Sequence, residues 1–252
     1  MSGGARAPPV PTPTAGDPGV RPPPEVRARD WRVRGISKVA GVVEVGSADL
    51  RGTVVVGGTL TAASLEFDGT LEARSQVAVS GKLRGQGQLG AEAGVRAGEA
   101  ELAGVVRVSG ELVASGRLRV RGRLQAPSVR SEVLDLRGSA QVPGEITAPS
   151  CRLTLTEDTS IGTIRCRDLR LRGPPPNLVR RVLSEEAIVR VDAVEGETVS
   201  IEFARVRFVR AREVTLGRGA HVAAVEGKVV RTHRSSRLGP ESWSRPPPGL
   251  SR

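Results

Sequence analysis

The chain has 252 residues, of which 38 are Lys or Arg and 27 are Asp or Glu, giving a formal net charge of +11. Aromatic residues make up only 2% and tyrosine is absent, which argues against an ordinary layered core and favours narrow strands packed by Val, Leu, Ala and Gly. No apolar run approaches the roughly 18 residues that a membrane-spanning helix needs, and the N-terminus lacks an apolar signal-peptide core, so we expect a cytoplasmic protein.

The first part of the chain is rich in proline. Residues 1–30 contain eight prolines and no hydrophobic periodicity, so we expect a disordered, extended tail there. A β-helical body is expected over residues 31–172, with an irregular first turn before the regular repeats begin near Leu50.

The repeat is clearest in residues 104–126, which read GVVRVSGELVASGRLRVRGRLQA. Two apolar residues alternate, a small residue such as Gly110, Gly116 or Gly122 follows, and the unit of about six residues recurs. Each unit is therefore predicted to be a short strand with one buried face and a small residue at its corner.

Taking every third strand start gives three columns of aliphatic or small residues spaced about 17 to 18 apart. The first column is Val54, Leu71, Leu89, Val106, Leu124 and Ala140; the second is Leu60, Val77, Val95, Leu112, Val129 and Ile146; the third is Leu65, Leu83, Leu102, Leu118, Leu134 and Leu153. Stacking these columns predicts an all-β fold, a single-stranded triangular β-solenoid in which each turn buries its inner face on its neighbours.

The six-residue repeat is interrupted near the end of the body. Residues 173–187 read GPPPNLVRRVLSEEA, where three prolines end strand pairing and Asn177 is suited to cap a short helix, so we expect a loop or short helical insertion. Closing β-helix turns are expected over 188–230. Residues 231–252 are basic and contain four prolines, which predicts a second disordered tail.

The positive charge has two interpretations. Arg117, Arg119, Arg121 and Arg123 alternate with inward positions, which favours a solvated outer wall that keeps the solenoid soluble. The alternative is an electropositive wall that attracts nucleic acid or an anionic surface. Nucleic acid is disfavoured as a partner because no aromatic stacking platform accompanies the arginines.

Motifs that could carry chemistry have simpler structural explanations. Gly85, Gly87 and Gly90 match a dinucleotide-binding spacing, yet the flanking residues follow the strand columns. Cys151 and Cys166 lack metal or redox spacing and are interpreted as small core residues, with a thiol contact between turns as the alternative. We assign no catalytic residue, no cofactor and no metal ligand.

Two enzyme classes with related architecture were weighed. A hexapeptide-repeat acyltransferase would need a loop histidine as general base, whereas His221 lies in a strand-like segment and His233 in the expected tail. A β-helical polysaccharide lyase or hydrolase would need clustered carboxylates on side loops, and Glu185 and Glu186 are better explained by a solvated helix face.

The V-x-V-x-G-x-L-x-A units of the body, together with residues 194–227, resemble the bactofilins, the polymer-forming bacterial cytoskeletal proteins. The closing-segment pattern is matched at Glu195, Gly196, Val199, Ile201, Glu202, Val206, Val209, Val214, Leu216, Gly217, Gly219, Val222, Val225 and Glu226. The resemblance covers about 36–228. The sequence departs from the family pattern at Ala211, Ala220 and Gly227, which bears on the packing of the end cap.

This resemblance implies a right-handed β-helix and a non-enzymatic scaffold that assembles into filaments without nucleotide. Its partner would be a second copy of the chain, and the tails would recruit cell-envelope proteins, polarity proteins or a membrane surface. The rivals kept open are an Arg-rich adaptor for nucleic acid or anionic surfaces and the acyltransferase.

For the assembly contact we expect the C-terminal end of the solenoid, where Phe203 and Phe208 are two of only three phenylalanines. Alternation from Val199 places Phe203 inside with Ile201, either as a core plug or as part of the contact. Phe208 is in the opposite register from Val209, so it is the ring expected to be exposed, and Phe208→Arg is expected to abolish association while sparing the fold.

Overall fold

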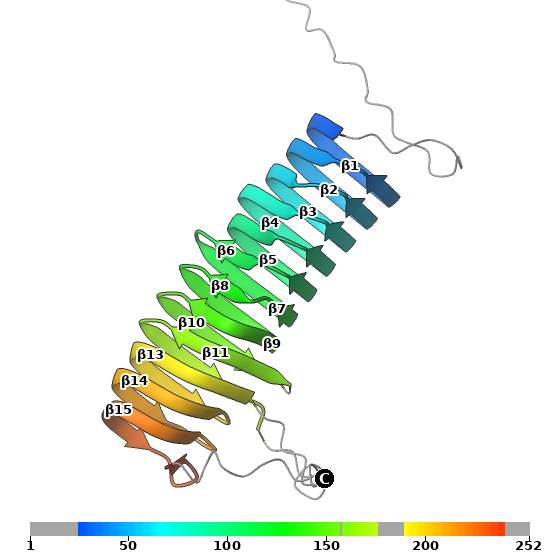
Figure 1. Ribbon diagram of the computed structural model, residues 1–252. Coiled ribbons are helices and arrows are strands. Elements are labelled where there is room, and N and C mark those ends of the chain that lie inside the picture. Colours follow the sequence, from blue (N-terminus) through cyan, green and yellow to red (C-terminus); the bar gives the residue numbers. More distant parts are fainter. Residues whose placement is uncertain (1–24, 157, 176–188, 240–252) are drawn as a thin grey trace, which may run out of the picture.

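The structure, a computed structural model, describes residues 25–156, 158–175 and 189–239. Within these residues every regular element is a β-strand, and neighbouring strands run parallel. They stack as about 12 turns of one elongated coil, from β1 at one end to β15 at the other (Figure 1). This confirms the β-solenoid that the repeats predict.

The strands are β1 (Glu25–Val39), β2 (Val42–Val56), β3 (Leu60–Ala73), β4 (Gln76–Ala91), β5 (Gly94–Val108), β6 (Glu111–Ala114), β7 (Arg117–Gln125), β8 (Ser128–Arg130), β9 (Val133–Thr147), β10 (Ser150–Leu155), β11 (Thr159–Arg165), β12 (Asp168–Arg172), β13 (Val189–Glu202), β14 (Arg205–Leu216), β15 (His221–Thr232) and β16 (Arg237–Leu238).

The first and second predicted columns are confirmed by the strand register. The first runs from Val54 to Ala140 as predicted. The second extends beyond the prediction at both ends, through Val26, Val43, Leu60, Val77, Val95, Leu112, Val129, Ile146, Ile164, Val194, Val209 and Val225. Steps between Val26 and Ile164 are 17 or 18 residues, as expected.

The third predicted column is wrong at two positions. Ala100 and Cys151 stand where we expected Leu102 and Leu153. Each face of the coil has two inward positions two residues apart, and both leucines are fully buried at the other one, so the hydrophobic pattern alone favoured the larger side chain. The observed third column is Trp31, Ala48, Leu65, Leu83, Ala100, Leu118, Leu134, Cys151, Leu169, Val199, Val214 and Val229.

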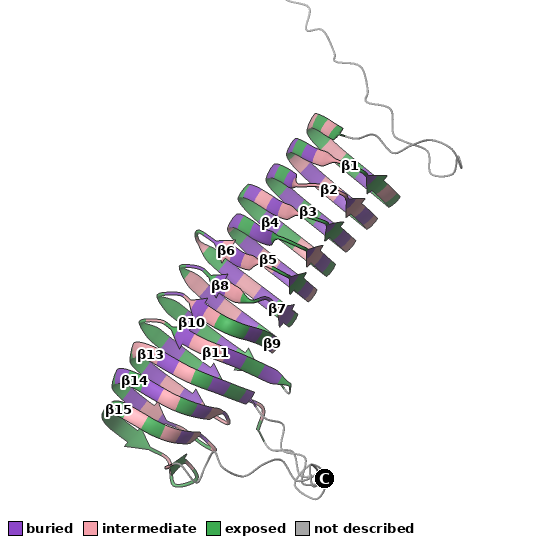
Figure 2. Ribbon diagram, in the orientation of Figure 1, coloured by how far each residue is buried: buried purple, intermediate pink, exposed green. Residues whose placement is uncertain are grey.

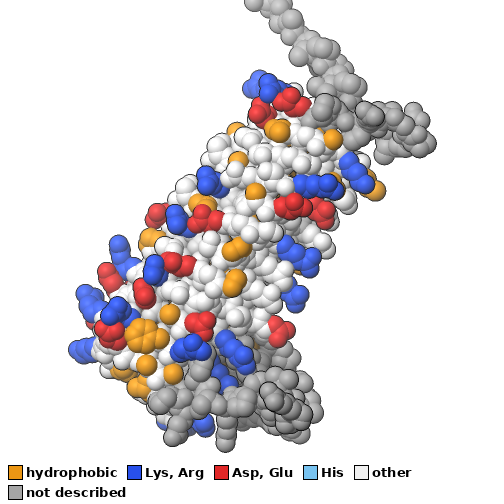
Figure 3. Space-filling view, viewed as in Figure 1, with side chains coloured by type: hydrophobic (Ala, Val, Ile, Leu, Met, Phe, Trp, Pro, Cys, Tyr) orange, Lys and Arg blue, Asp and Glu red, His pale blue; other side chains and the backbone are white. Residues whose placement is uncertain are grey.

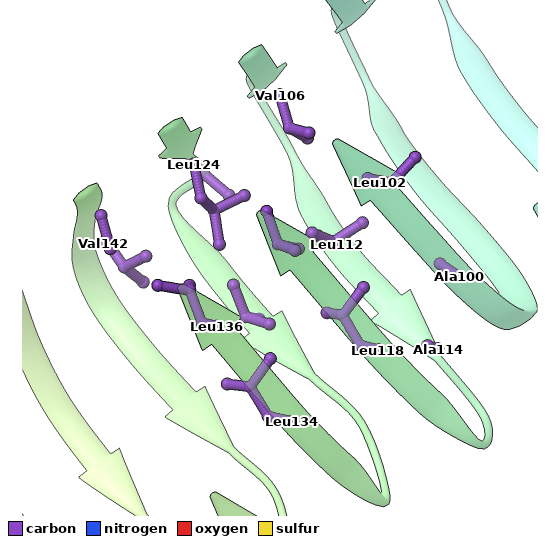
Figure 4. Close-up of a cluster of buried hydrophobic side chains, with 14 of the residues drawn as sticks. Ala100, Leu102, Val106, Leu112, Ala114, Leu118, Leu124, Leu134, Leu136 and Val142 are labelled. Carbon is purple, nitrogen blue, oxygen red and sulfur yellow. The ribbon is translucent and has the colours of Figure 1, made fainter. Parts of the chain in front are cut away.

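These columns form the core. Figure 4 shows side chains from successive turns, among them Leu112, Leu118 and Leu134, pointing into the interior of the coil. Each fully buried aliphatic side chain of this kind contributes about 1.5–3 kcal/mol of hydrophobic free energy. A turn buries its inner face only between two neighbours, so the terminal turns are the places where this contribution is incomplete.

Strand pairing continues around one corner of each regular turn, so β2 to β5 are 14–16 residues long and not about six as the repeat suggested. At this corner Gly104 has φ +120°, and a Cβ on it would overlap the carbonyl oxygen of Gly87. Only glycine adopts that backbone without strain and lets the turns approach so closely. The corner is formed by Gly35, Gly52, Gly69, Gly87, Gly104, Gly122 and Gly138.

The outer wall carries the charges, as predicted for Arg117, Arg121 and Arg123, which are exposed. Arg119 is half-buried because its guanidinium lies between acids of the two adjacent turns, 3.2 Å from Glu101 and 3.6 Å from Asp135. Comparable ion pairs across turns are Arg27–Glu44, Arg130–Glu111, Arg165–Glu145, Arg165–Glu195, Arg172–Glu202 and Arg210–Glu226.

The expected boundaries shift at both ends of the body. Residues 25–30, assigned to the tail, form the start of β1, where Val26 and Ala28 pack partly against the core. Pairing also continues past Val230, to Thr232 in β15 and through β16. These C-terminal residues are paired but exposed, so no hydrophobic alternation marks them. The rest of both expected tails lies outside the described residues.

The interruption expected at 173–187 separates β12 from β13. The register step from Arg165 to Glu195 is 30 residues, whereas the regular steps are 17 or 18. Residues 176–188, including the cap expected at Asn177, lie outside the described residues. The next two steps of the second column, from Val194 to Val209 and on to Val225, shorten to 15 and 16 residues.

Candidate assembly interface at the ends of the solenoid

The first turn has one open edge. β1 pairs with β2 along its length, and no described strand covers its other side. Val26 and Trp31 begin the second and third columns and are half-buried, although their partners in the next turn, Val43 and Ala48, are buried. Ile36 is 69% exposed. Within the described residues, the N-terminal end therefore presents a strand edge without a partner strand beside apolar side chains.

The last turn also has an open strand edge beside apolar side chains. β16 pairs with β15 only at His221 and Val222, so among the described strands the rest of β15 is open on that side. Val229 ends the third column with 37% exposure, whereas Val214, its partner in the preceding turn, is completely buried. Val230 and Leu238 are 56% and 55% exposed.

In the part of the chain that the structure describes, exposed large hydrophobic side chains are confined to these two turns. The large hydrophobic residues exposed there are Ile36, Val229, Val230 and Leu238. Figure 2 shows buried positions recurring along every turn of the body, whereas exposed positions prevail in the last part of β15. Apolar side chains concentrated at an open sheet edge mark a surface suited to association.

Both ends are basic. β1 carries five cationic side chains and two acidic ones. Residues 221–239 carry Lys228, Arg231, Arg234 and Arg237 against a single acid, Glu226. The guanidinium of Arg210 donates two hydrogen bonds to Glu226, at 2.9 and 3.1 Å, and this contact raises the pKa of Arg210. An end-to-end contact therefore brings two positive surfaces together.

Phe203 is not in the core position that alternation predicts. It is half-buried at a corner, with a left-handed φ of +50°, and its N–H donates to the carbonyl of Arg218 at 2.8 Å. A Cβ on Gly219 would lie 2.8 Å from the Phe203 ring, so the ring covers that glycine. The regular strand geometry ends at Glu202, and the alternation that placed Phe203 inside does not extend through the turn.

Phe208 faces outward, opposite to the buried Val209, as predicted from register. It is half-buried on the side wall of β14, between Ala193 and Ala224 of the adjacent turns. Since β15 covers the edge of β14, Phe208 does not lie on the end surface. A role for Phe208 in self-association stays a prediction, and its position makes such a contact lateral.

Sequence reasoning missed the residues of the end surface. Val229 follows the inward periodicity of the third column, so its sequence pattern is the same as that of a core residue. Only the place where the turns stop makes it exposed. The exposure of Ile36 could have been predicted from the sequence. Ile36 follows the corner residue Gly35 at an outward position and pairs with the polar Thr53 of the next turn.

The two cysteines meet across adjacent turns. Cys151 is buried in the third column and Cys166 is half-buried at a corner of the next turn; both are free thiols. A hydrogen bond between the two thiols, together with burial, raises the pKa of Cys151. The same hydrogen bond lowers the pKa of Cys166. The opposite pKa shifts indicate that the two thiols interact between turns, the alternative that the sequence analysis kept, while the Cys151 thiol also donates to the carbonyl of Ala148 at 3.7 Å.

The glycines of the dinucleotide-like motif have structural roles. Gly85, Gly87 and Gly90 all lie within β4, not between a strand and a helix. Gly85 leaves room for the ring of Phe67, and Gly87 belongs to the glycine corner. Of the two histidines, His221 lies in β15 as expected, and His233 lies in the turn before β16, where its Nδ1 is 2.8 Å from the Ser235 hydroxyl.

An open depression of about 390 Å³ lies along one side of β2 to β6. Small side chains line it, and Arg96 is the one charged residue among them. The described residues contain no cluster of three or more His, Cys, Asp or Glu side chains suited to a metal ion. They also contain no helix with the length and hydrophobicity needed to cross a bilayer.

No protein-family model, no curated protein and no solved structure matches the chain. The function is therefore inferred from the fold and from the surfaces described above.

Proposed function

We propose that this chain is a non-enzymatic, bactofilin-like cytoplasmic scaffold that assembles into filaments by docking one solenoid end on another. The observation that carries the proposal is the confinement of exposed large hydrophobics, in the described residues, to the two terminal turns. A docked turn would pair the open strand edges and cover the apolar side chains in one step.

The magnitudes fit reversible assembly. Covering four aliphatic side chains contributes at most about 1.5–3 kcal/mol each, and each new backbone hydrogen bond contributes about 0.5–1.5 kcal/mol net. Association opposes this with an estimated 4–15 kcal/mol of lost translational and rotational freedom. The favourable and unfavourable contributions are of similar size, so the loss of one or two of these apolar side chains is expected to weaken the contact measurably.

The assembly step needs no bound nucleotide in this mechanism, because backbone pairing and apolar contact drive it. Recruitment of partners such as envelope or polarity proteins is assigned to the terminal segments, residues 1–24 and 240–252, which lie outside the described residues. The resemblance of the strand units to the bactofilins supports this role.

The test is sedimentation and negative-stain microscopy of the full chain without nucleotide and with a metal chelator. The wild-type chain is expected to form filaments, and the double substitution Val229→Ser with Val230→Ser, which removes apolar surface without adding charge, is expected to abolish them. The matched control is Val113→Ser, at an outward position in the middle of the body between Arg96 and Arg130.

Circular dichroism must show the same β signal in all three proteins. Filaments of the double variant that sediment like the wild type would remove the C-terminal end from the contact. Filaments that form only with nucleotide would contradict the mechanism.

A further inference from the structure

The charges beside the second column alternate in sign up to the open C-terminal end. The position that follows this column is occupied in the last four turns by Arg165, Glu195, Arg210 and Glu226. Ion pairs of 3.0 Å and 2.9 Å join the first two and the last two of these residues. At the other end of the solenoid the same position begins with Arg27, whose guanidinium lies 3.4 Å from the Glu44 carboxylate of the next turn.

Arg27 and Glu226 are the two ends of this alternating series. Within the body, Arg165 lies between acids of both adjacent turns, at 3.2 and 3.0 Å. In the described strands Glu226 has a neighbouring turn only on the side of Arg210, and Arg27 has one only on the side of Glu44. If β1 of a second copy followed β15 with both columns continued, Arg27 would lie between two acids and Glu226 between two arginines. We call this arrangement in-register docking.

A second position gives the same match. Glu213 and Lys228 are register partners in β14 and β15, immediately before the third column. In β1 this position holds Asp30, which accepts a hydrogen bond of 2.6 Å from the Ser47 hydroxyl. In-register docking places Lys228 beside Asp30, and both side chains are exposed in the single chain. Figure 3 shows acidic side chains lying among basic ones near the first turn and near the β13 to β15 end.

The apolar columns also continue across such a contact. The second column ends at Val225 and begins at Val26, and the third ends at Val229 and begins at Trp31. None of these four side chains is fully buried, although the members of both columns in the middle turns are. In the middle turns a following turn buries these positions, so β1 of a second copy is suited to cover them.

In-register docking also has unfavourable contacts. It places Arg231 beside Arg32 and Arg237 beside Lys38, because each pair shares one outward position of the coil. Like charges directly opposite on neighbouring strands are destabilising. These two pairs account for the repulsion expected between two basic ends, and they leave the two opposite-charge pairs to define the register.

We propose that the C-terminal end of one copy docks in register on the N-terminal end of the next, with Glu226 beside Arg27 and Lys228 beside Asp30. The inference rests on the proposed function and specifies its contact. A head-to-tail contact of this kind does not close on itself, so it generates an open filament with a direction. A symmetric contact between two identical ends reverses the strand direction at the joint and does not continue these columns.

The first experiment is disulfide cross-linking of full chains that each carry one cysteine, in a background with Cys151→Ala and Cys166→Ala. The four variants are Arg32→Cys, Lys38→Cys, Arg231→Cys and Arg237→Cys. These substitutions keep the proposed ion pairs and remove like charges. Neighbouring strands lie about 4.8 Å apart, within the Cα separation of about 4.4–6.8 Å that a disulfide needs. Mixtures of two variants are oxidised with diamide and analysed by electrophoresis without reductant, while sedimentation and circular dichroism report filaments and fold.

The in-register mixtures are Arg32→Cys with Arg231→Cys and Lys38→Cys with Arg237→Cys, and the exchanged mixtures pair the same variants the other way. We expect the in-register mixtures to cross-link on the order of ten-fold more, because exchanged cysteines lie on different faces of the coil. Filaments with cross-links mainly between two N-terminal or two C-terminal positions, with equal cross-linking in both kinds of mixture, or with none would overturn this inference alone. A wild-type chain that forms no filaments would remove the proposed function together with it.

The second experiment exchanges one proposed charge pair. Asp30→Lys faces Lys228 and is expected to raise the critical concentration for filaments by roughly five-fold, and adding Lys228→Glu is expected to restore it. The matched control combines Asp30→Lys with Arg234→Glu, which restores the same net charge from the turn between β15 and β16. Equal recovery in the control would show that net charge and not register decides, and no recovery in either double variant would contradict the pairing.

Discussion

The ring of Phe67 fills the space that a side chain at residue 85 would need, because Phe67 and Gly85 occupy the same inward position of consecutive turns. Phe67 is 4% exposed, so an aromatic ring can be accommodated in a regular turn when the next turn supplies a glycine. The two positions together hold about the volume of two aliphatic side chains.

This pairing predicts a compensating double substitution. Gly85→Leu alone is expected to destabilise the body by about 1–3 kcal/mol through overpacking, and Phe67→Leu alone by a comparable amount through the cavity it leaves. The double variant, with leucine at both positions, restores the regular column and is expected to recover most of the loss. Thermal unfolding followed by circular dichroism measures the coupling, and additive losses would show that the two positions pack independently.

Much of the fold follows from the sequence because a stacked architecture repeats one rule. The first and second columns could be predicted from spacing alone, since a side chain and its partner one turn away share the same environment. The third column shows the limit: Ala100 is small, and the pattern could not distinguish it from the larger Leu102 at the second inward position of the same face.

The candidate site was less predictable for a physical reason. Val229 and Val214 occupy the same inward position of consecutive turns. Val214 is buried because another described turn lies beyond it, and Val229 is exposed because none does. Aromatic content pointed instead to Phe203 and Phe208, which occupy a corner and a side wall. Residues at an end are defined by where stacking stops, and periodicity does not carry that information.

The glycine corner gives a second prediction. Gly104→Ala requires a residue with a Cβ at φ +120°, directly over the Gly87 carbonyl. We expect a loss of at least about 2 kcal/mol in the free energy of unfolding from backbone strain and overlap. Gly116→Ala is the control. The φ of Gly116 is not left-handed, and a Cβ added there would lie 3.2 Å from the carbonyl oxygen of Gly98. Equal melting temperatures for the two variants would contradict this account.

The cysteine pair predicts unequal reactivity. Cys166, half-buried and with a lowered pKa, is expected to react with a disulfide reagent in the folded protein, whereas Cys151 reacts only on unfolding. Reactivity of Cys166 should rise with pH through a midpoint lower than that of an ordinary thiol, because its pKa is lowered. Cys151→Ala removes the hydrogen bond and should move that midpoint upward. Two thiols that react at one rate in the native protein would rule out this arrangement.

The charge of the two ends predicts how salt affects assembly. The end surfaces are both basic, with five cations against two acids in β1 and four against one in residues 221–239, so docking brings like charges together. Screening reduces this repulsion, because the Debye length falls from about 20–30 Å near 0.01–0.02 M salt to about 8 Å at 0.15 M. Filament mass, measured by sedimentation, is therefore expected to increase over this range.

To test the cause of the assembly response, Arg32→Glu with Arg34→Glu makes the N-terminal end acidic and should reverse its sign, so that filaments are favoured at low salt. If filament mass falls with salt in the wild type, or the reversed-charge variant behaves as the wild type does, the contact is not between these two basic ends.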